Sequence, residues 1–297
     1  MKAFIIRSIT FLSLWILFLL SNFGINLTFI KSTPPPCAEK ENIFLIGDSH
    51  IMTDILPDET QGRFNLGNHG EPYYISYLKI QKLLKTCKAR PSTVILGMGP
   101  QNFSNFNELK LQTPKYAKAI YKDYYPLLLE APSFFSDWKM PYDKRMYYKT
   151  IIKTMCLYPH KNHKAWLGHF DGRPYRLEVA DLDKTIKRHY YAESDTLCHI
   201  SQIAVQALDS IITLCSKENA HLIILAPPLH RRYRKAIPDL FQKQFETMLN
   251  TCRKKGIKVL DYSQLSLPDT LFYDYDHLNT KGAAVFTQIL KKDLNWK

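Results

Sequence analysis

The stretch Ile43-Phe-Leu-Ile-Gly-Asp-Ser-His50 joins an apolar run directly to a polar turn. The run 43–46 is short and unbroken, which is typical of a strand that is buried on both faces of a parallel sheet. Gly47 allows the chain to turn sharply. We therefore expect Ser49 to lie where a helix begins, just beyond the carboxyl end of a strand.

The same order of short apolar strand, loop and helix recurs along the chain. We expect further strands ending near residue 66 and over 93–96, 221–226 and 258–262, and helices over 74–86, 201–214, 238–255 and 280–294. This alternation predicts an α/β fold with about five parallel strands and helices on both faces of the sheet. In such folds the reactive groups gather at the carboxyl ends of the strands.

The segment from about 103 to 200 breaks this pattern. It is rich in Tyr, Lys, Pro and Trp and contains no clear strand. We interpret it as a largely helical insertion, within a domain over 41–297, that lies above the carboxyl edge of the sheet. Insertions at that edge usually shape substrate specificity.

The N-terminus has the features of a signal anchor over residues 1–31. Lys2 and Arg7 precede an apolar run from Ile9 to Leu20, which continues with interruptions to Ile30. This length can cross a bilayer as a helix. The flanking positive charges predict a cytoplasmic N-terminus, which places the rest of the chain in the periplasm or at the cell surface.

An uncleaved anchor is favoured over a cleaved signal peptide, because Ser21-Asn-Phe23 is a poor cleavage site. The Pro-rich stretch that follows, over residues 32–40, is expected to act as a short stiff tether.

Composition narrows the choice of partners. The 297-residue chain carries a net charge of +13, and 45% of its residues are hydrophobic, which is enough for a sizeable core. A basic surface favours an anionic partner such as phospholipid head groups or an acidic glycan, although it can also simply be solvated. Nucleic acid is disfavoured for a domain outside the cytoplasm.

The chain has six cysteines, at positions 37, 87, 156, 198, 215 and 252. An oxidising compartment permits disulfides among them, but the sequence alone leaves the pairing open. Cys215 and Cys252 each end a predicted helix and are a candidate pair, and buried free thiols are the alternative. There is no C-x-x-C motif to indicate a zinc site.

Four polar blocks follow predicted strands or precede the last helix: Gly47-Asp-Ser-His50, Asn65-Leu-Gly-Asn-His-Gly70, Gly97-Met-Gly-Pro-Gln-Asn102 and Asp274-Tyr-Asp-His-Leu-Asn279. Alone, Ser49 would be no more than a helix N-cap. A serine becomes a useful nucleophile only with a base and a stabilised anion beside it, and the other blocks contain residues of those types.

These blocks resemble those of the SGNH (GDSL-like) hydrolase superfamily. Its members share a G-D-S turn, an N-x-G-x-x-G loop, a G-x-N loop and a D-x-x-H pair. Three blocks match well, the third only approximately, and together they span residues 43–285. The resemblance, which extends to membrane-anchored envelope esterases and O-acyltransferases, implies a three-layer α/β/α, flavodoxin-like fold and ester chemistry.

Carried over by position, the resemblance implies that Ser49 is the nucleophile, His277 the base and Asp274 the acid that orients it. The D-x-x-H spacing agrees, because it puts carboxylate and imidazole on one side of a turn. A Ser–His dyad is the alternative. Asp276 is a rival acid, but we expect it to point elsewhere because it directly precedes His277.

The resemblance also implies an oxyanion hole. Its donors would be the backbone N–H groups of Ser49 and Gly70 and the side chain of Asn102 or Gln101. Spacing from the glycine favours Gln101, whereas residue type favours Asn102, which we prefer. No metal and no cofactor is expected.

Other histidines are candidates for contact with substrate, namely His50, His69 and His230, although an exposed or supporting role is the simpler interpretation. His160, His163 and His169 lie near Trp166 but lack carboxylates or thiolates at a firm spacing. We therefore interpret them as part of a solvated loop.

The sequence thus favours a serine-dependent ester hydrolase or O-acyl transferase. Its substrate would be an acyl ester, acetyl foremost, of a cell-envelope glycan or lipid. The alternative is a non-catalytic envelope protein that binds glycan through a degenerate site. A lipase would suit the tether but has no distinctive feature of its own.

Overall fold

The computed structural model describes residues 1–39, 41–87, 92–157, 159, 163–175, 177, 181–192 and 195–296. The chain forms two compact units. One comprises Met1–Pro34 with Lys110–Trp166, and the other comprises Pro35–Leu109 with Leu167–Lys297. Each is considered by itself below.

The larger unit is built on a five-stranded parallel sheet with strand order β2-β1-β3-β4-β5. The strands are β1 (Asn42–Ile46), β2 (Arg63–Asn65), β3 (Ser92–Gly97), β4 (His221–Ala226) and β5 (Lys258–Asp261). In the central register Leu45 lies opposite Asn65 on one side and Ile95 on the other. The predicted α/β fold is confirmed, and this order is the flavodoxin-like one.

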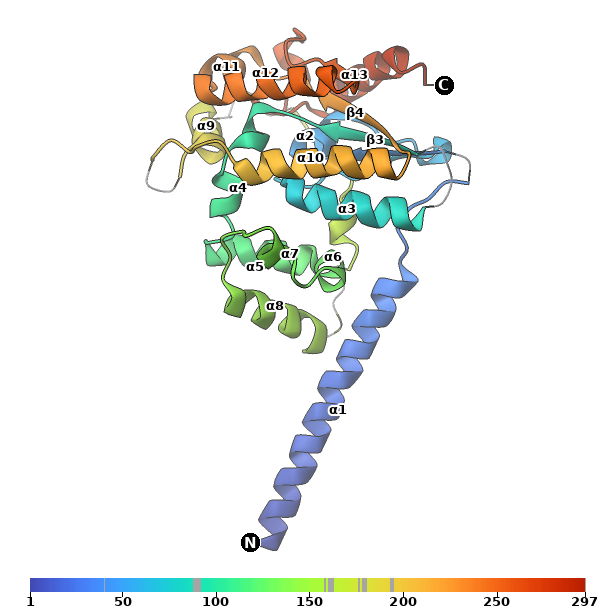
Figure 1. The fold of residues 1–297 in the computed structure, drawn as a ribbon, viewed down its shortest axis with the longest axis vertical. Helices are drawn as coiled ribbons and strands as arrows, with labels where there is room; N and C mark the ends of the chain where they lie inside the picture. Colours follow the sequence, from blue (N-terminus) through green and yellow to red (C-terminus); the bar gives the residue numbers. More distant parts are fainter. Residues whose placement is uncertain are drawn as a thin grey trace. The chain divides into compact units, whose positions relative to one another are not determined.

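Helices cover the sheet as a three-layer arrangement requires. The helices of the larger unit are α2 (Ser49–Asp54), α3 (Tyr73–Thr86), α4 (Phe106–Leu109), α9 (Leu182–Tyr190), α10 (Gln202–Lys217), α11 (Arg231–Ala236), α12 (Asp239–Lys254) and α13 (Thr280–Asp293). Helices α3 and α10 lie side by side (Figure 1). Helix α13 contacts α2, and both pack on alternate side chains of the central strands, including Leu45 and Ile95.

The smaller unit is helical. It contains α1 (Lys2–Ser32), α5 (Pro114–Asp123), α6 (Tyr125–Glu130), α7 (Phe134–Asp137) and α8 (Lys144–Cys156). Its interior is aromatic, since the rings of Tyr121, Phe135 and Tyr147 meet edge to face. Within the described residues of 103–200 there is no strand, which confirms a helical insertion. Only 110–166 belongs to this unit, whereas 167–200 joins the unit of the sheet.

Helix α1 is long and apolar enough to cross a membrane. A membrane anchor and a signal sequence share these properties, and the helix is compatible with either.

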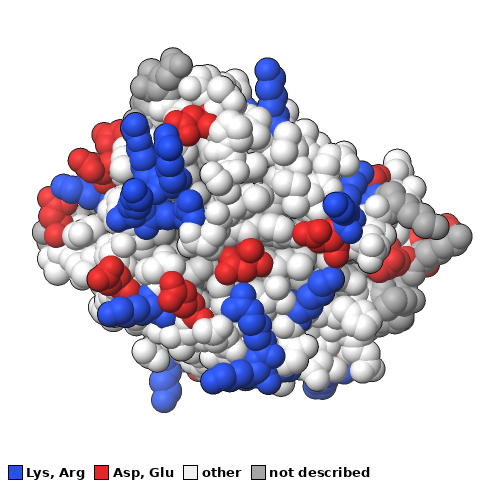
Figure 2. All heavy atoms as spheres, turned by 90° about the horizontal axis from the view of Figure 1, so that it is seen from above, with Lys and Arg blue, Asp and Glu red and all other residues white. Residues whose placement is uncertain are grey.

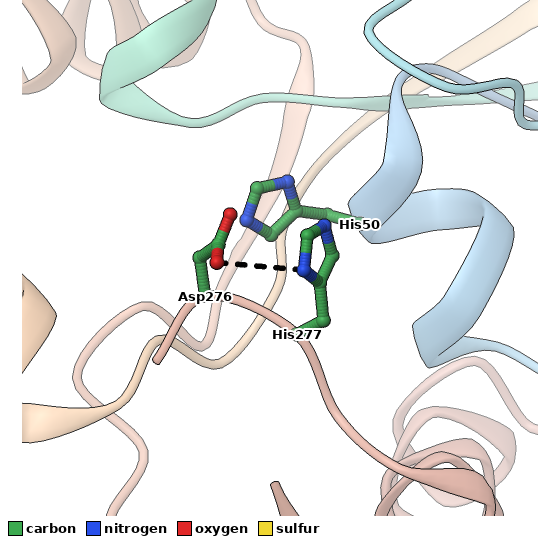
Figure 3. Close-up of side chains that lie close together, drawn as sticks. All are labelled: His50, Asp276 and His277. Atoms are coloured by element: carbon green, nitrogen blue, oxygen red, sulfur yellow. Dashed lines mark ion pairs between the residues drawn. The ribbon is translucent and has the colours of Figure 1, made fainter. Parts of the chain in front are cut away.

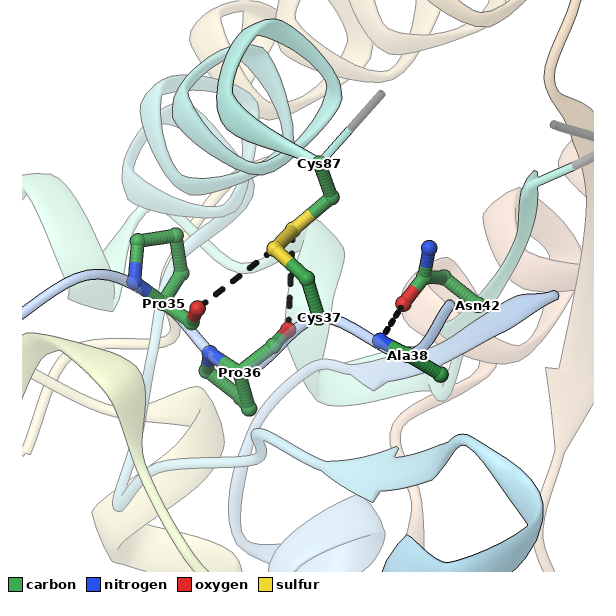
Figure 4. Close-up of a disulfide and its surroundings, with 6 residues drawn as sticks. All are labelled: Pro35, Pro36, Cys37, Ala38, Asn42 and Cys87. Atoms are coloured by element: carbon green, nitrogen blue, oxygen red, sulfur yellow. Dashed lines mark hydrogen bonds between the residues drawn. A yellow bond between two sulfur atoms is a disulfide. The ribbon is translucent and has the colours of Figure 1, made fainter. Parts of the chain in front are cut away.

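A disulfide joins Cys37 to Cys87 (Figure 4). Cys37 lies within the Pro-rich tether and Cys87 directly follows α3, so the bond ties the start of the larger unit to the end of a core helix. The candidate pair Cys215 and Cys252 is wrong, because both are buried free thiols. Both positions end helices, but the end of a helix carries no information about which other helix end lies within bonding distance.

Alkylation tests the pairing. Iodoacetamide added to the unfolded full chain should modify four cysteines without reductant and six after reduction, because Cys156, Cys198, Cys215 and Cys252 are free. The bond closes a loop with a sequence separation of 50, so its loss should destabilise the fold by roughly 4 kcal/mol in the chain-entropy model. Mass spectrometry counts the adducts, and six without reductant would contradict the assignment.

Candidate active site

Ser49, His277 and Asp274 come together at the carboxyl edge of the sheet. The Ser49 Oγ lies 2.7 Å from His277 Nε2, and His277 Nδ1 lies 2.9 Å from Asp274 Oδ1. The backbone N–H of His277 also donates to Asp274 Oδ1, at 2.8 Å. Ser49 is half-buried whereas His277 is buried, so the hydroxyl is the more accessible end of this chain of groups.

Asp48 is the N-cap of α2 and connects the turn that carries Ser49 to the third polar block, residues 97–102. Its Oδ1 accepts from the backbone N–H of His50 at 3.0 Å and lies 3.1 Å from His50 Nδ1. Its Oδ2 accepts from Gln101 Nε2 and Asn102 Nδ2, both at 2.9 Å. Burial opposes ionisation of Asp48, but the charge of His50 and these donors outweigh it and hold the pKa of Asp48 well below its usual range.

Asn65, the first residue of the glycine loop, holds the far end of α2. Its Nδ2 donates to the carbonyls of Ile51 at 2.7 Å and Ile55 at 2.6 Å, and its Oδ1 accepts from Gly67 N. Gly67 approaches α2 so closely that a Cβ there would lie 2.4 Å from Met52 N. The block thus needs asparagine and glycine at these positions to hold α2 against the loop.

A buried ion pair supports the same loop. Lys79 of α3 and Glu71 have side chains with no exposed surface, and Lys79 Nζ lies 2.5 Å from Glu71 Oε2. The same Nζ donates to the carbonyl of Leu66 at 2.8 Å. Burial lowers the pKa of Lys79, and Glu71 opposes that shift. Removing one member of such a pair typically destabilises a protein by about 3–5 kcal/mol.

The segment that carries His277 is fixed by two side chains. The backbone N–H of Leu278 donates to Asp54 Oδ1 of α2 at 2.9 Å. Asn279 caps α13, because its Oδ1 accepts from the N–H groups of Lys281 and Gly282. Burial raises the pKa of Asp54 to about 6, against the charges of the nearby histidines. The helix that begins with Ser49 therefore also holds the segment that carries His277.

Asp276 does not point away from His277, contrary to expectation. It is fully buried, and its Oδ1 lies 3.4 Å from His277 Nδ1. Its Oδ2 lies 3.2 Å from Arg188 and 3.6 Å from His189 Nε2. Burial raises the pKa of Asp276, opposed by the charges of His277 and Arg188. Asp274 is nearer to His277 Nδ1, but both carboxylates face that nitrogen.

His50 lies beside His277 and is not at an exposed surface. The two rings lie 4.9 Å apart between centroids, and His50 is buried (Figure 3). Burial alone would lower the pKa of His50, but the charge and hydrogen bond of Asp48, with help from Asp276, raise it to about 9. A cationic His50 would pair directly with the carboxylate of Asp48.

His50, Asp276 and His277 also meet the spacing of a metal site, since their ligand atoms lie within 4.8 Å of one another. A metal ion held there would engage either His277 Nδ1, which lies beside Asp274, or His277 Nε2, which lies beside Ser49 Oγ. It would therefore disrupt the Ser49–His277–Asp274 arrangement.

The raised pKa of His50 has a measurable consequence. Its folded pKa of about 9 exceeds its ordinary value of 6.5, so its stabilising contribution is full below pH 6.5 and is lost as the pH rises through 9. The shift corresponds to about 3 kcal/mol. Between pH 6.5 and 9.5, the Tm of the full chain in detergent should fall more than that of His50→Gln. Parallel curves for the two proteins would contradict the protonated state.

The two candidate amides of the third block both bind Asp48, but only one is fixed at both ends. Asn102, in the 3-10 turn η2 (Pro100–Phe103), also accepts from the N–H of Gly99 at 2.7 Å through its Oδ1. The Gln101 Oε1 is buried without a hydrogen-bond partner among the described residues. Gly70 is exposed and has a left-handed backbone with φ of 53°.

The remaining histidines have separate surroundings. His69 is exposed, with its Nδ1 3.4 Å from Arg173 and its Nε2 3.9 Å from Asp171. Partial desolvation and the charge of Arg173 lower the pKa of His69, and His277 contributes to the same shift. His230 is the buried N-cap of α11 and its Nε2 lies 3.2 Å from Asp269. It is held by these contacts.

The two described histidines near Trp166 in the sequence, His163 and His169, have different partners. His163 bonds Thr33 in the smaller unit, whereas His169 donates its backbone N–H to the carbonyl of Gly67 in the larger one. His160 lies outside the described residues.

The segment 167–173 lies against the elements of the site, which was not predicted from the sequence. The N–H of Asp171 donates to the carbonyl of Met52, and a Cβ on Gly168 would lie 2.1 Å from the carbonyl oxygen of Gly67. Arg173 lies over the ring of Tyr273, 5.0 Å from its centroid. This segment therefore contacts α2 and the glycine loop and presents Arg173 near the block that carries His277. The glycine at position 168 was the one available signal.

Similarity to known proteins is slight. A protein-family model matches residues 180–296, which is less than half of the chain. No curated protein matches the sequence. The chain is similar to the crystal structure of a candidate acylhydrolase from Bacteroides fragilis, with a TM-score of 0.39 and 9% identity over 89% of this chain and 90% of that one. Similarity this low does not establish a shared activity.

Proposed function

We propose that the protein is a serine-dependent ester hydrolase or O-acyl transferase that works through an acyl-Ser49 intermediate. One observation carries the proposal. His277 Nε2 lies 2.7 Å from Ser49 Oγ while a carboxylate, Asp274, holds the other ring nitrogen at 2.9 Å. A hydroxyl, an imidazole and a carboxylate in this order are the parts that nucleophilic serine catalysis requires.

The reaction then follows the geometry. Ser49 Oγ attacks the acyl carbonyl as its proton passes to His277 Nε2, and the carbonyl oxygen becomes an oxyanion. Collapse of the tetrahedral intermediate breaks the ester bond, and His277 returns the proton to the leaving alcohol. Water or a sugar hydroxyl, deprotonated by His277, then attacks acyl-Ser49 and releases an acid or a new ester.

Three donors are proposed for the oxyanion: the backbone N–H groups of Ser49 and Gly70 and the Nδ2 of Asn102. Asn102 is preferred to Gln101 because the bond from Gly99 N to its Oδ1 orients the amide. Asp274 is proposed to fix the tautomer of His277 and to stabilise its cation.

The proposed location is the extracytoplasmic face of a membrane, with α1 as the anchor. Lys2 and Arg7 at the start of α1 favour a cytoplasmic N-terminus. The Cys37–Cys87 disulfide supports an oxidising compartment. The proposed substrate is therefore a cell-envelope glycan or lipid that carries acyl groups, with acetyl as the first choice.

A non-catalytic glycan-binding protein is the second candidate. It is favoured by the irregular third block, in which both amides are engaged by Asp48. In that case the Ser49–His277 pair would be present without the oxyanion donors that turnover needs.

A fluorophosphonate probe tests the nucleophile. The native full chain in detergent should be labelled, Ser49→Ala should lose all labelling, and His277→Asn should lose at least about 1,000-fold in labelling rate. Ser216→Ala is the matched control, because Ser216 is an exposed serine of α10. Labelling that persists in Ser49→Ala would overturn the assignment, and a native protein that stays unlabelled would favour the binding alternative.

The oxyanion hole is tested by substitution of the two amides. Asn102→Ala should lower kcat for p-nitrophenyl acetate by about 100- to 1,000-fold with little change in KM, because the bond is made only to the developing charge. Gln101→Ala should have the smaller effect. The reverse order would move the role to Gln101. Acetylated glycan, with and without an acceptor sugar, then distinguishes hydrolysis from transfer.

A further inference from the structure

The positive charge of the chain is concentrated in the smaller unit. Residues 110–166 contain 11 Lys and Arg against 4 Asp and Glu, a net charge of +7. Residues 1–34 add +3, which leaves only +3 of the total +13 for the larger unit. On the face shown in Figure 2, basic and acidic side chains are interspersed. The helical unit is therefore the basic part of the protein.

Helix α1 changes character along its length. From Lys2 to Ser21 no residue is buried, whereas Asn22 and Asn26 are buried. The charged Lys2 and Arg7 lie outside the apolar layer, so a hydrocarbon core of about 30 Å takes about 20 residues counted from Ser8, at 1.5 Å per residue, and ends near Leu27. If this part of α1 lies in lipid, the surface of the membrane falls close to Asn26.

Helix α8 packs at that level. Asn26 Nδ2 donates to the carbonyls of Met155 at 2.9 Å and Thr154 at 3.4 Å, so the C-terminal end of α8 is bound directly to α1. Figure 1 shows α8 beside the C-terminal part of α1, and the two helices are in contact. Helix α8 therefore lies within a few residues of the level at which α1 leaves the apolar layer.

The outer face of α8 has the composition of an interfacial helix. Tyr147 and Ile151 point into the unit, whereas the exposed residues are Lys144, Arg145, Tyr148, Lys149, Ile152 and Lys153. Among the described residues, no carboxylate forms an ion pair with Arg145, Lys149 or Lys153. Basic side chains interleaved with exposed tyrosine and isoleucine suit the boundary between head groups and acyl chains.

We propose that the outer face of α8 binds the anionic phospholipid head groups of the leaflet from which α1 emerges. Arg145, Lys149 and Lys153 pair with lipid phosphates, and Tyr148 and Ile152 enter the upper acyl region. Each basic side chain near an anionic surface adds to the attraction. The inference rests on the membrane-spanning role of α1 in the proposed function and is independent of the chemistry at Ser49.

The test uses the full chain in nanodiscs of phosphatidylcholine alone or with 30% phosphatidylglycerol, monitored by backbone hydrogen exchange. Amides of residues 144–157 should exchange about tenfold more slowly with phosphatidylglycerol, and salt should reverse the effect because it screens the charges. Arg145→Gln/Lys149→Gln/Lys153→Gln should lose this lipid dependence. The matched control Lys243→Gln/Lys254→Gln/Lys258→Gln removes three exposed charges from the larger unit and should retain it.

Equal exchange in the two lipids, or slowed exchange that persists in the α8 variant, would overturn the proposal. Extraction at alkaline pH tests separately whether α1 spans the membrane. A chain with a spanning α1 stays with the lipid whether or not α8 binds head groups. Fluorophosphonate labelling of Ser49 should be unchanged in the α8 variant, so a failure of the proposed chemistry and a failure of lipid binding are distinguishable.

Discussion

The site depends on the contacts made by one buried carboxylate, that of Asp48. It accepts hydrogen bonds from the backbone N–H of His50 and from the amides of Gln101 and Asn102, and it lies beside the His50 ring. A buried carboxylate is tolerated only with such partners. Asp48 therefore fixes the start of α2, and with it Ser49, relative to the turn that follows β3.

Two more buried side chains extend the same principle. Asn65 binds the carbonyls at the end of α2, and Asp54 binds the N–H of Leu278. The loops after β1, β2 and β3 and the segment before α13 are thus joined by short polar side chains in addition to apolar packing. Such bonds are directional, so they hold the Ser49–His277 contact in one geometry before any substrate arrives.

The local patterns made much of this fold and site predictable. Apolar strands, glycine turns and the order of the polar blocks are each encoded in short stretches of sequence. The sheet, and the segments that contain Ser49 and His277, could therefore be predicted from these stretches. The Cys37–Cys87 bond, the nearness of Asp276 to His277, and the path of 167–173 did not follow. The first and the last depend on where distant segments meet, and the direction of the Asp276 side chain depends on its contacts with Arg188 and His189. All three are set by tertiary packing and not by local propensity.

The same distinction applies to the insertion. Its helices were predictable, but the attachment of α8 to α1 through Asn26 was not, because one asparagine in an apolar helix does not identify its partner. The higher positive charge of the smaller unit could be interpreted as a lipid-binding feature only once the contact between α8 and α1 was known.

The most direct measurement of the central claim is peptide mapping of the full chain, acid-quenched within seconds of mixing with p-nitrophenyl acetate. The account predicts a single acetyl ester on Ser49, formed as p-nitrophenol is released. Release of p-nitrophenol with the acetyl group on another residue, or with no acyl adduct during turnover, would contradict an acyl-Ser49 intermediate.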